Sequence, residues 1–185
     1  MSSYSISAVT GTAPLSVVDL KDYLLVTHTG QDTEIQALID SAIAMAEEVL
    51  GFHLVAKTVV ERIKYFPTNG LIYLTFGKVA SVSSITYYDT DEVEQNLDLG
   101  TVFIDTFSYE GVVELLPNQD WPSQVSTRRY PITITYTTTD IDDDFIKLAL
   151  KKLVIDFYTR REDRIDVRTP QAISKLLRYL KLYKF

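Results

Sequence analysis

The stretch that most constrains the fold is an amphipathic run between Asp32 and Gly51. Its apolar residues recur at spacings of three and four, namely Ile35, Leu38, Ile39, Ala42, Ile43, Ala46, Val49 and Leu50. This periodicity predicts one helix with one buried stripe. Asp32 can accept a hydrogen bond from the first turn, and Gly51 can adopt the left-handed conformation that ends a helix. Because a single stripe must be covered, the rest of the chain has to supply packing partners.

Two further helices are predicted, one before and one well after this run. The first extends from about Val17 to Leu25, where Ser16 and Asp19 have the spacing of a capping box. The second extends over Phe145–Thr159, and its apolar residues cover nearly the whole circumference. A helix that is apolar on all sides is expected to be central in the bundle.

The chain between the second and third helices reads as a series of short strands. Runs of β-branched and aromatic residues alternate with turn-forming Gly, Pro, Asn and Asp. The predicted strands are Val55–Phe66, Leu71–Phe76, Ser81–Tyr88, Val93–Leu97, Thr101–Asp105, Val112–Leu115 and Ile132–Thr138. Short strands without helices between them indicate an antiparallel meander or a small barrel rather than parallel βαβ units.

These elements together predict an α+β protein, a small helical bundle with an inserted antiparallel β meander or small barrel and a C-terminal helix. Residues 14–54 and 140–168 would form the helical core, and residues 55–139 the inserted β subdomain. Residues 1–13 are small and polar, which predicts a flexible N-terminal arm. Residues 169–185 are predicted to form a C-terminal docking helix, because Thr169 and Pro170 are a helix start signal.

Composition narrows the class of protein. The chain is 46% apolar and 23% charged, which is typical of a folded domain, and it has no cysteine, so disulfides and thiolate chemistry are excluded. No run of about 18 to 20 apolar residues could span a bilayer, and the first twelve residues lack the features of a signal peptide. We therefore expect no membrane partner and a protein that stays in the compartment where it is made.

Charge is divided unevenly along the chain. Residues 1–144 carry 7 basic and 21 acidic side chains, whereas residues 145–185 carry 11 basic and 4 acidic ones. Such asymmetry suggests a C-terminal segment that meets an anionic partner, although solvated helix faces would have the same composition. Arg160, Arg161, Arg164 and Arg168 could contact phosphates. The acidic remainder of the chain argues against specific DNA binding.

The sequence predicts no catalytic, cofactor-binding or metal-binding residues. The chain has two histidines, His28 and His53, and neither belongs to a catalytic motif. The acidic residues from Asp140 to Asp144 could hold a divalent metal in a hydrolase or nuclease. The run is better explained as the cap and dipole partner of the helix that follows it.

The strongest functional signal is the terminal segment, which is basic, amphipathic and rich in aromatic residues, as interface anchors often are. The residues predicted to dock on a partner are Ile173, Leu176, Leu177, Arg178, Tyr179, Leu180, Lys181, Tyr183, Lys184 and Phe185. The alternative is that this stripe folds back onto its own domain. A membrane-surface helix is less favoured, because other membrane signals are missing.

Six stretches of the chain resemble stretches of a known family in their sequence pattern and in their order. They are PLSVVDLKDYLLV (14–26), DTEIQALIDSAIAMAEEVLGFHLV (32–55), IYLTFGKVASVSSITYYDTDEVEQNL (72–97), NQDWPS (118–123), ITITYTTT (132–139) and IKLALKKLVIDFYTRRED (146–163). The chain resembles phage head-tail connector (adaptor) proteins of the gp6-like class, in the longer form with an inserted sheet. The resemblance covers most of the chain.

The resemblance implies a non-enzymatic virion protein at the head-tail junction, assembled in the cytoplasm of a bacterial host. Such proteins form a ring, commonly of twelve copies, beneath the portal protein, where they extend the DNA channel and receive the head-closure or tail protein. DNA would pass without specific binding, and docking on the portal would fall to Pro170–Phe185. The alternative within the same class is another phage neck or tail-completion protein.

Overall fold

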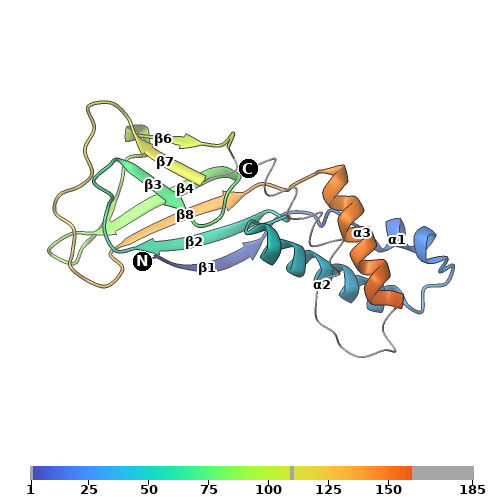
Figure 1. Ribbon diagram of the computed structural model, residues 1–185. Coiled ribbons are helices and arrows are strands. Elements are labelled where there is room, and N and C mark those ends of the chain that lie inside the picture. Colours follow the sequence, from blue (N-terminus) through green and yellow to red (C-terminus); the bar gives the residue numbers. More distant parts are fainter. Residues whose placement is uncertain (1, 109–110, 160–185) are drawn as a thin grey trace. The chain divides into compact units, whose positions relative to one another are not determined.

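The computed structural model describes residues 2–108 and 111–159. The chain divides into two compact units (Figure 1). Of the described residues, 2–11 and 55–139 form the β unit, and 12–54 and 140–159 form the helical unit. The three helices and two antiparallel sheets of the described residues confirm the predicted α+β class. In the described part of the chain, no helix has the length and apolar character needed to cross a membrane.

The helical unit contains α1 (Val17–Leu24), α2 (Asp32–Leu50) and α3 (Asp144–Thr159), each within one residue of its predicted bounds. The apolar stripe of α2 packs against α3, and α1 contacts both helices. The fully or nearly fully buried side chains include Leu20, Ile35, Ile39, Ala46, Ile146, Leu150 and Leu153. Burial of these aliphatic groups stabilises the unit by about 1.5 to 3 kcal/mol for each large side chain.

The helix ends follow the sequence signals, with one exception. Ser16 and Asp19 form the predicted capping box, in which the Asp19 N–H donates to Ser16 Oγ (3.2 Å) and the Ser16 N–H to Asp19 Oδ2 (2.9 Å). Gly51 ends α2 with a φ of 78°, and its N–H donates to the Glu47 carbonyl. Asp32 does not cap α2 as predicted. It is the first helical residue, and its carboxylate accepts a hydrogen bond from Lys21 Nζ at 2.6 Å.

The third helix is not surrounded by protein, as its all-round apolar composition had suggested. Its buried residues are Ile146, Ala149, Leu150, Leu153 and Val154, which lie toward the other helices. Phe145 and Leu148 remain 47% and 43% exposed. Among the described residues, only α1 and α2 pack on α3, which is too few helices to cover every side of it, so Phe145 and Leu148 stay at the surface.

The β unit contains two antiparallel sheets. The five-stranded sheet has the order β1 (Ser2–Val9), β2 (Lys57–Ile63), β8 (Ile132–Thr138), β4 (Val79–Tyr88) and β5 (Glu94–Asn96). The three-stranded sheet has the order β3 (Leu71–Leu74), β7 (Gly111–Leu115) and β6 (Val102–Asp105), and a short 3₁₀ helix, η1, at Leu99–Thr101 precedes β6. All seven predicted strands are present, and β8 lies between β2 and β4.

The predicted flexible arm at residues 1–13 is wrong for its greater part, because Ser2–Val9 forms strand β1. This strand pairs antiparallel with β2 from Ser2 opposite Ile63 to Val9 opposite Lys57. The Tyr4 ring also meets the Phe76 ring edge-on at 4.7 Å. Backbone pairing to the edge of β2 holds the strand, and a composition rich in serine does not reveal such pairing.

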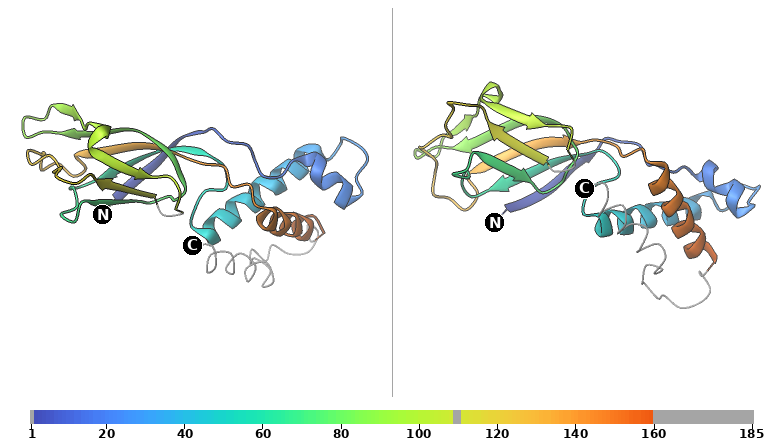
Figure 2. Two further views of the ribbon diagram at one scale, coloured as in Figure 1. Left: turned by 90° about the horizontal axis from the view of Figure 1, so that it is seen from above. Right: turned by 45° about the horizontal axis from the view of Figure 1, so that its top comes forward.

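The two sheets face each other across one apolar core (Figure 2). Strands of both sheets contribute buried residues to it, among them Val59, Ile72, Ile85, Val113 and Ile134. At the edge of this core lies one buried carboxyl group, that of Glu61, which is 1% exposed. Its oxygens accept hydrogen bonds from the Thr75 N–H (2.9 Å), Thr75 Oγ1 (2.6 Å) and Tyr136 Oη (3.1 Å). These bonds join β2 and β8 of one sheet to the residue that follows β3 of the other.

Each sheet turns its second face outward, and the two outward faces differ in composition. The threonine face belongs to the five-stranded sheet and includes Thr58, Val60, Arg62, Ser81, Ser84, Thr86, Thr133, Thr135 and Thr137. The aromatic face belongs to the three-stranded sheet and includes Leu71, Tyr73, Phe103, Asp105, Val112 and Glu114. Because the inner faces share one core, the two outward faces point in opposite directions.

Candidate functional site

The ten residues predicted to dock on a partner, Ile173 to Phe185, lie outside the described residues. The same holds for the basic residues from Arg160 to Arg168. Their role therefore stays a prediction, and the surfaces below belong to residues 2–108 and 111–159.

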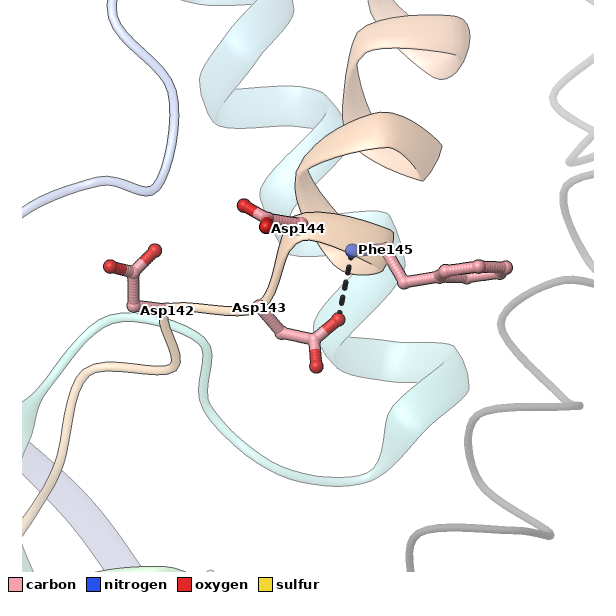
Figure 3. Close-up of a pocket in the computed structure, with 4 residues that line it drawn as sticks. All are labelled: Asp142, Asp143, Asp144 and Phe145. Atoms are coloured by element: carbon pink, nitrogen blue, oxygen red, sulfur yellow. Dashed lines mark hydrogen bonds between the residues drawn. The ribbon is translucent and has the colours of Figure 1, made fainter.

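The acidic run before α3 forms a helix cap. One oxygen of Asp143 accepts hydrogen bonds from the Phe145 N–H (2.9 Å) and the Ile146 N–H (3.2 Å), two donors of the first helical turn. Figure 3 shows the Asp143 carboxylate turned toward this turn, whereas the carboxylates of Asp142 and Asp144 point elsewhere. These three residues and Phe145 line a shallow depression.

A cation of the protein itself neutralises part of this acidic run. Lys147 Nζ forms an ion pair with Asp142 Oδ1, and this hydrogen bond raises the pKa of the Lys147 ammonium group. Asp140 Oδ2 accepts a weak hydrogen bond from the Thr12 N–H at 3.3 Å. Within residues 2–108 and 111–159, no three His, Asp or Glu side chains are placed to hold a metal ion. The geometry supports the cap that the sequence favoured over the metal site.

The two histidines occupy different environments. His28 lies in the exposed turn between α1 and α2. His53 is buried just after α2, where its Nδ1 lies 3.4 Å from Glu47 Oε2. The other oxygen of Glu47 accepts a hydrogen bond from the Leu54 N–H at 2.8 Å. Glu47 therefore organises the chain as it leaves α2, and His53 packs beside it.

The helical unit displays apolar side chains that its core does not use. Val18, Tyr23 and Leu25 are exposed on and after α1, as are Phe145 and Leu148 on α3. Leu25 is 88% exposed and has a φ of 55°, in the left-handed region that a branched side chain rarely adopts. Sequence reasoning missed this residue, because periodicity identifies the apolar residues that a helix buries and not those that its end displays.

A basic and aromatic cluster lies at one end of the threonine face. This arginine corner consists of Arg62, Tyr88, Arg128, Arg129 and Tyr130, which line a shallow cleft together with Glu94 and Thr133. The Arg128 guanidinium lies 3.9 Å from the centroid of the Tyr88 ring and 3.5 Å from Glu92 Oε2. Arg129 lies 5.4 Å from the centroid of the Tyr130 ring. Arginine stacked on tyrosine is typical of surfaces that recognise carboxylates or other anions.

The arginine corner was not predicted from the sequence, although a signal was present. Arg128, Arg129 and Tyr130 are consecutive, and three of the seven basic residues before position 145 meet in this corner. Arg62 is 66 positions away from Arg128 in the chain. The pairing of β2 with β8, which places Arg62 opposite Thr133, brings them together.

The described surfaces are suited to binding. They combine exposed aromatic groups, arginines and an extended hydroxyl-rich face, which are the components of protein–protein interfaces. The buried carboxyl group of Glu61 has structural partners. The charged groups near the acidic depression are engaged in a cap and an ion pair.

Comparisons with solved structures show that the chain shares its fold with protein chains of gene transfer agent particles. The chain is similar to a chain from the virion of a native gene transfer agent particle, with a TM-score of 0.75 and 18% identity over 95% of this chain and 93% of that one. It is similar to a chain from the neck of an empty particle of this kind computed with C6 symmetry, with a TM-score of 0.73 and 19% identity over 97% and 94% of the two chains.

A third match is to a chain from the neck of a native gene transfer agent particle computed with C12 symmetry, with a TM-score of 0.71 and 19% identity over 97% of this chain and 93% of that one. Curated proteins give no significant sequence match. A family model described as head completion protein matches residues 14–171, which is most of the chain. The chain thus belongs to the head completion protein family.

Proposed function

We propose that the protein is a structural component of the neck of a phage-like particle, where it completes the head and joins it to the tail. The observation that carries this proposal is the likeness of nearly the whole chain, 95 to 97% of it, to chains of virion and neck structures. Family membership over residues 14–171 supports the same role. The role is mechanical, since surfaces that hold neighbours in place accomplish it without a chemical step.

We further propose that the protein is the adaptor ring beneath the portal, with twelve copies that extend the DNA channel and receive the head-closure or tail protein on the other side. The symmetry stated for the neck of a native particle, C12, supports a ring of this size. The acidic character of the described chain supports a channel through which DNA slides. The helical unit carries 4 basic and 12 acidic residues over positions 12–54 and 140–159, and such a surface repels phosphates.

The terminal segment is proposed to dock on the portal protein. Residues 160–185 carry 8 basic and 3 acidic side chains, the opposite balance to the rest of the protein. In this arrangement Leu176, Leu177 and Leu180 would fill an apolar groove, and Arg178, Lys181 and Lys184 would meet acidic groups on the portal. Contacts of this kind, apolar at the centre and charged at the rim, are typical of specific interfaces.

Light scattering of the full-length protein, alone and mixed with the portal protein of the same particle, tests the docking. The intact protein should join a complex with the portal ring. Removal of residues 170–185, or the triple change L176S/L177S/L180S, should weaken that complex at least about tenfold, since loss of central anchors costs 2 kcal/mol or more. The matched control Q171S/K175S changes the same segment outside the proposed docking residues and should bind like the intact protein.

A terminal deletion that binds the portal as well as the intact protein would overturn the docking proposal. A monomer in the absence of portal would not, because a ring can form on its template. If labelling of the particle places the protein elsewhere in the neck or tail, the alternative of another neck or tail-completion protein holds instead.

A further inference from the structure

The two outward faces of the β unit are complementary in composition and charge. Of the nine positions named on β2, β8 and β4, only Arg62 is charged, and Glu94 on β5 adds one acidic group at the end of the face. A solvated sheet face normally carries many charged side chains, since these interact well with water. Serine and threonine lose little side-chain freedom when they are covered, so a face made of them is easily packed against another surface.

The aromatic face has the opposite character. Tyr73 on β3 is 59% exposed and Phe103 on β6 is 51% exposed. They flank β7, where Val112 is paired with Tyr73 and Glu114 with Phe103. Large aromatic rings held on a rigid sheet are the usual anchors of a protein interface. Asp105, on the same face, is already bound to Ser108, so Glu114 is the acid that this face offers.

Charge distinguishes the two faces as well. Glu114 makes the aromatic face acidic, and the arginine corner makes one end of the threonine face basic. The corner brings together three arginines and one glutamate, Glu94, so it keeps an excess of positive charge. Two threonine faces, or two aromatic faces, would therefore repel each other. A threonine face and an aromatic face would attract each other.

We propose that the aromatic face of one copy packs on the threonine face of the next copy, so that Glu114 meets the arginine corner. This inference rests on the proposed ring, and it names the surfaces that build that ring. Because the two faces point in opposite directions, each copy can hold one neighbour on either side, as a heterologous contact requires. Such contacts close into a ring when the rotation between copies allows.

The absence of cysteine provides a direct test by crosslinking. Three variants of the full chain are assembled into particles and treated with a short bismaleimide, namely Y73C, T135C and the double variant Y73C/T135C. Both positions are on outward faces, and two stacked sheets are about 10 Å apart before their outward side chains are counted, so a short linker joins different copies. The double variant should give a ladder of multimers on a denaturing gel. Particles that mix the two single variants should give crosslinked dimers only.

Several results would overturn the inference. Dimers formed by Y73C alone or by T135C alone would show that like faces meet. Absence of crosslinks from the double variant, in particles that contain the protein in their neck, would show that these faces do not meet at all, while the proposed function would stand. Particles whose neck lacks the protein would instead refute the proposed function, and averaged images of the same sample distinguish the two failures.

A second measurement tests how much the aromatic side chains of Tyr73 and Phe103 contribute to the proposed contact. The variant Y73S/F103S should reduce incorporation into particles about tenfold or more, as removal of interface anchors does. The variant Y65S changes an aromatic residue that is equally exposed but lies in the loop after β2, outside both faces. It should be incorporated like the unchanged protein. Equal incorporation of Y73S/F103S and Y65S would contradict the proposed contact.

Discussion

The β unit and the helical unit use their charged groups in different ways. In the helical unit, three of the four described lysines are engaged within the unit, Lys21 with Asp32, Lys147 with Asp142 and Lys151 with the Tyr23 ring. In the β unit, arginines gather at the end of an outward face. The three lysines of the helical unit are thus spread over separate contacts, whereas three arginines of the β unit share one surface cleft.

The interiors of the two units also differ, because one is mainly aliphatic and the other has a buried hydrogen-bond network at its edge. Aliphatic side chains form most of the core of the helical unit, and such a core tolerates changes that conserve its volume. The β unit places Glu61 at the edge of its core with three donors around it, and such a network requires one particular geometry. We infer that the β unit is the more rigid of the two, which suits a surface that must match a neighbour.

The largest effect is expected from Glu61 in the β unit. The substitution E61A should lower the free energy of unfolding by about 4 kcal/mol, because three donors lose a buried acceptor at 1 to 3 kcal/mol each. Denaturant unfolding followed by the fluorescence of Trp121, the single tryptophan of the chain, measures it in the β unit. The control Y136F removes one donor and should cost about 1 kcal/mol. A loss below 1 kcal/mol for E61A would refute the role assigned to the network.

Because of Tyr136, the stability of the β unit should also depend on pH in the alkaline range. Burial, with the nearby Glu61 carboxylate, raises the pKa of the Tyr136 hydroxyl above its ordinary value of 10.0. Above that value the unfolded chain loses this proton and the folded chain keeps it, so stability should fall as the pH rises past 10. The Y136F variant should lose less stability over the same range. Equal slopes for both proteins would contradict the assignment.

A cavity in the helical unit should have the next largest effect. Leu153 is fully buried on α3, and L153A should cost about 3 kcal/mol. Circular dichroism at 222 nm follows the helices, and Trp121 fluorescence follows the β unit. We expect the helical signal to be lost at a lower denaturant concentration while the fluorescence transition moves less. Equal shifts of the two signals would mean that the units unfold as one, and the contrast in rigidity would then fail.

The capping box of α1 is expected to contribute less. Hydrogen bonds from Ser16 lower the pKa of the Asp19 carboxyl below its ordinary value of 3.8. This contribution is present above that pH and is lost as the pH falls through the lowered value. The S16A variant should therefore be about 1 kcal/mol less stable at neutral pH, and the difference should shrink in acid. A difference that does not change with pH would show that the carboxylate takes no part.

The smallest effects are expected in the acidic run before α3. The D143A variant removes the cap and should cost about 1 kcal/mol, whereas D142A removes an exposed ion pair and should have no measurable effect on stability. Calorimetry with Mg²⁺ and Ca²⁺ completes the comparison. No binding is expected, either for the unchanged protein or for D142A. Tight binding that D142A or D143A abolishes would revive the metal site that the geometry disfavours.

Local patterns made most of the fold predictable. The stripe between Asp32 and Gly51, the capping box at Ser16 and the strands from Val55 to Thr138 depend on neighbouring residues, and the structure contains all of them. Strand β1 was missed because its pairing partners on β2 are 48 to 61 positions away in the chain. The exposed face of α3 was missed because composition shows which residues can be buried and not how many neighbours are present to bury them.

The candidate surfaces were less predictable than the fold. The capping role of the acidic run could be predicted, since a cap acts on the next few residues of the same chain. The arginine corner and the two outward faces depend on the register of paired strands, which places Arg62 beside Thr133 and Tyr73 beside Val112. No local pattern contains that register. The docking residues from Ile173 to Phe185 remain a prediction from composition and family resemblance.

The most direct test of the central claim is to locate the protein in the particle. A small tag inserted between Thr68 and Asn69, in the exposed turn after β2, would mark the protein in averaged electron micrographs of the neck. If the protein is a neck component, we expect a ring of extra density between head and tail, repeated with the symmetry of the neck. We also expect tailless heads in cells that lack the protein. Complete particles formed without the protein, or a tag found away from the neck, would contradict it.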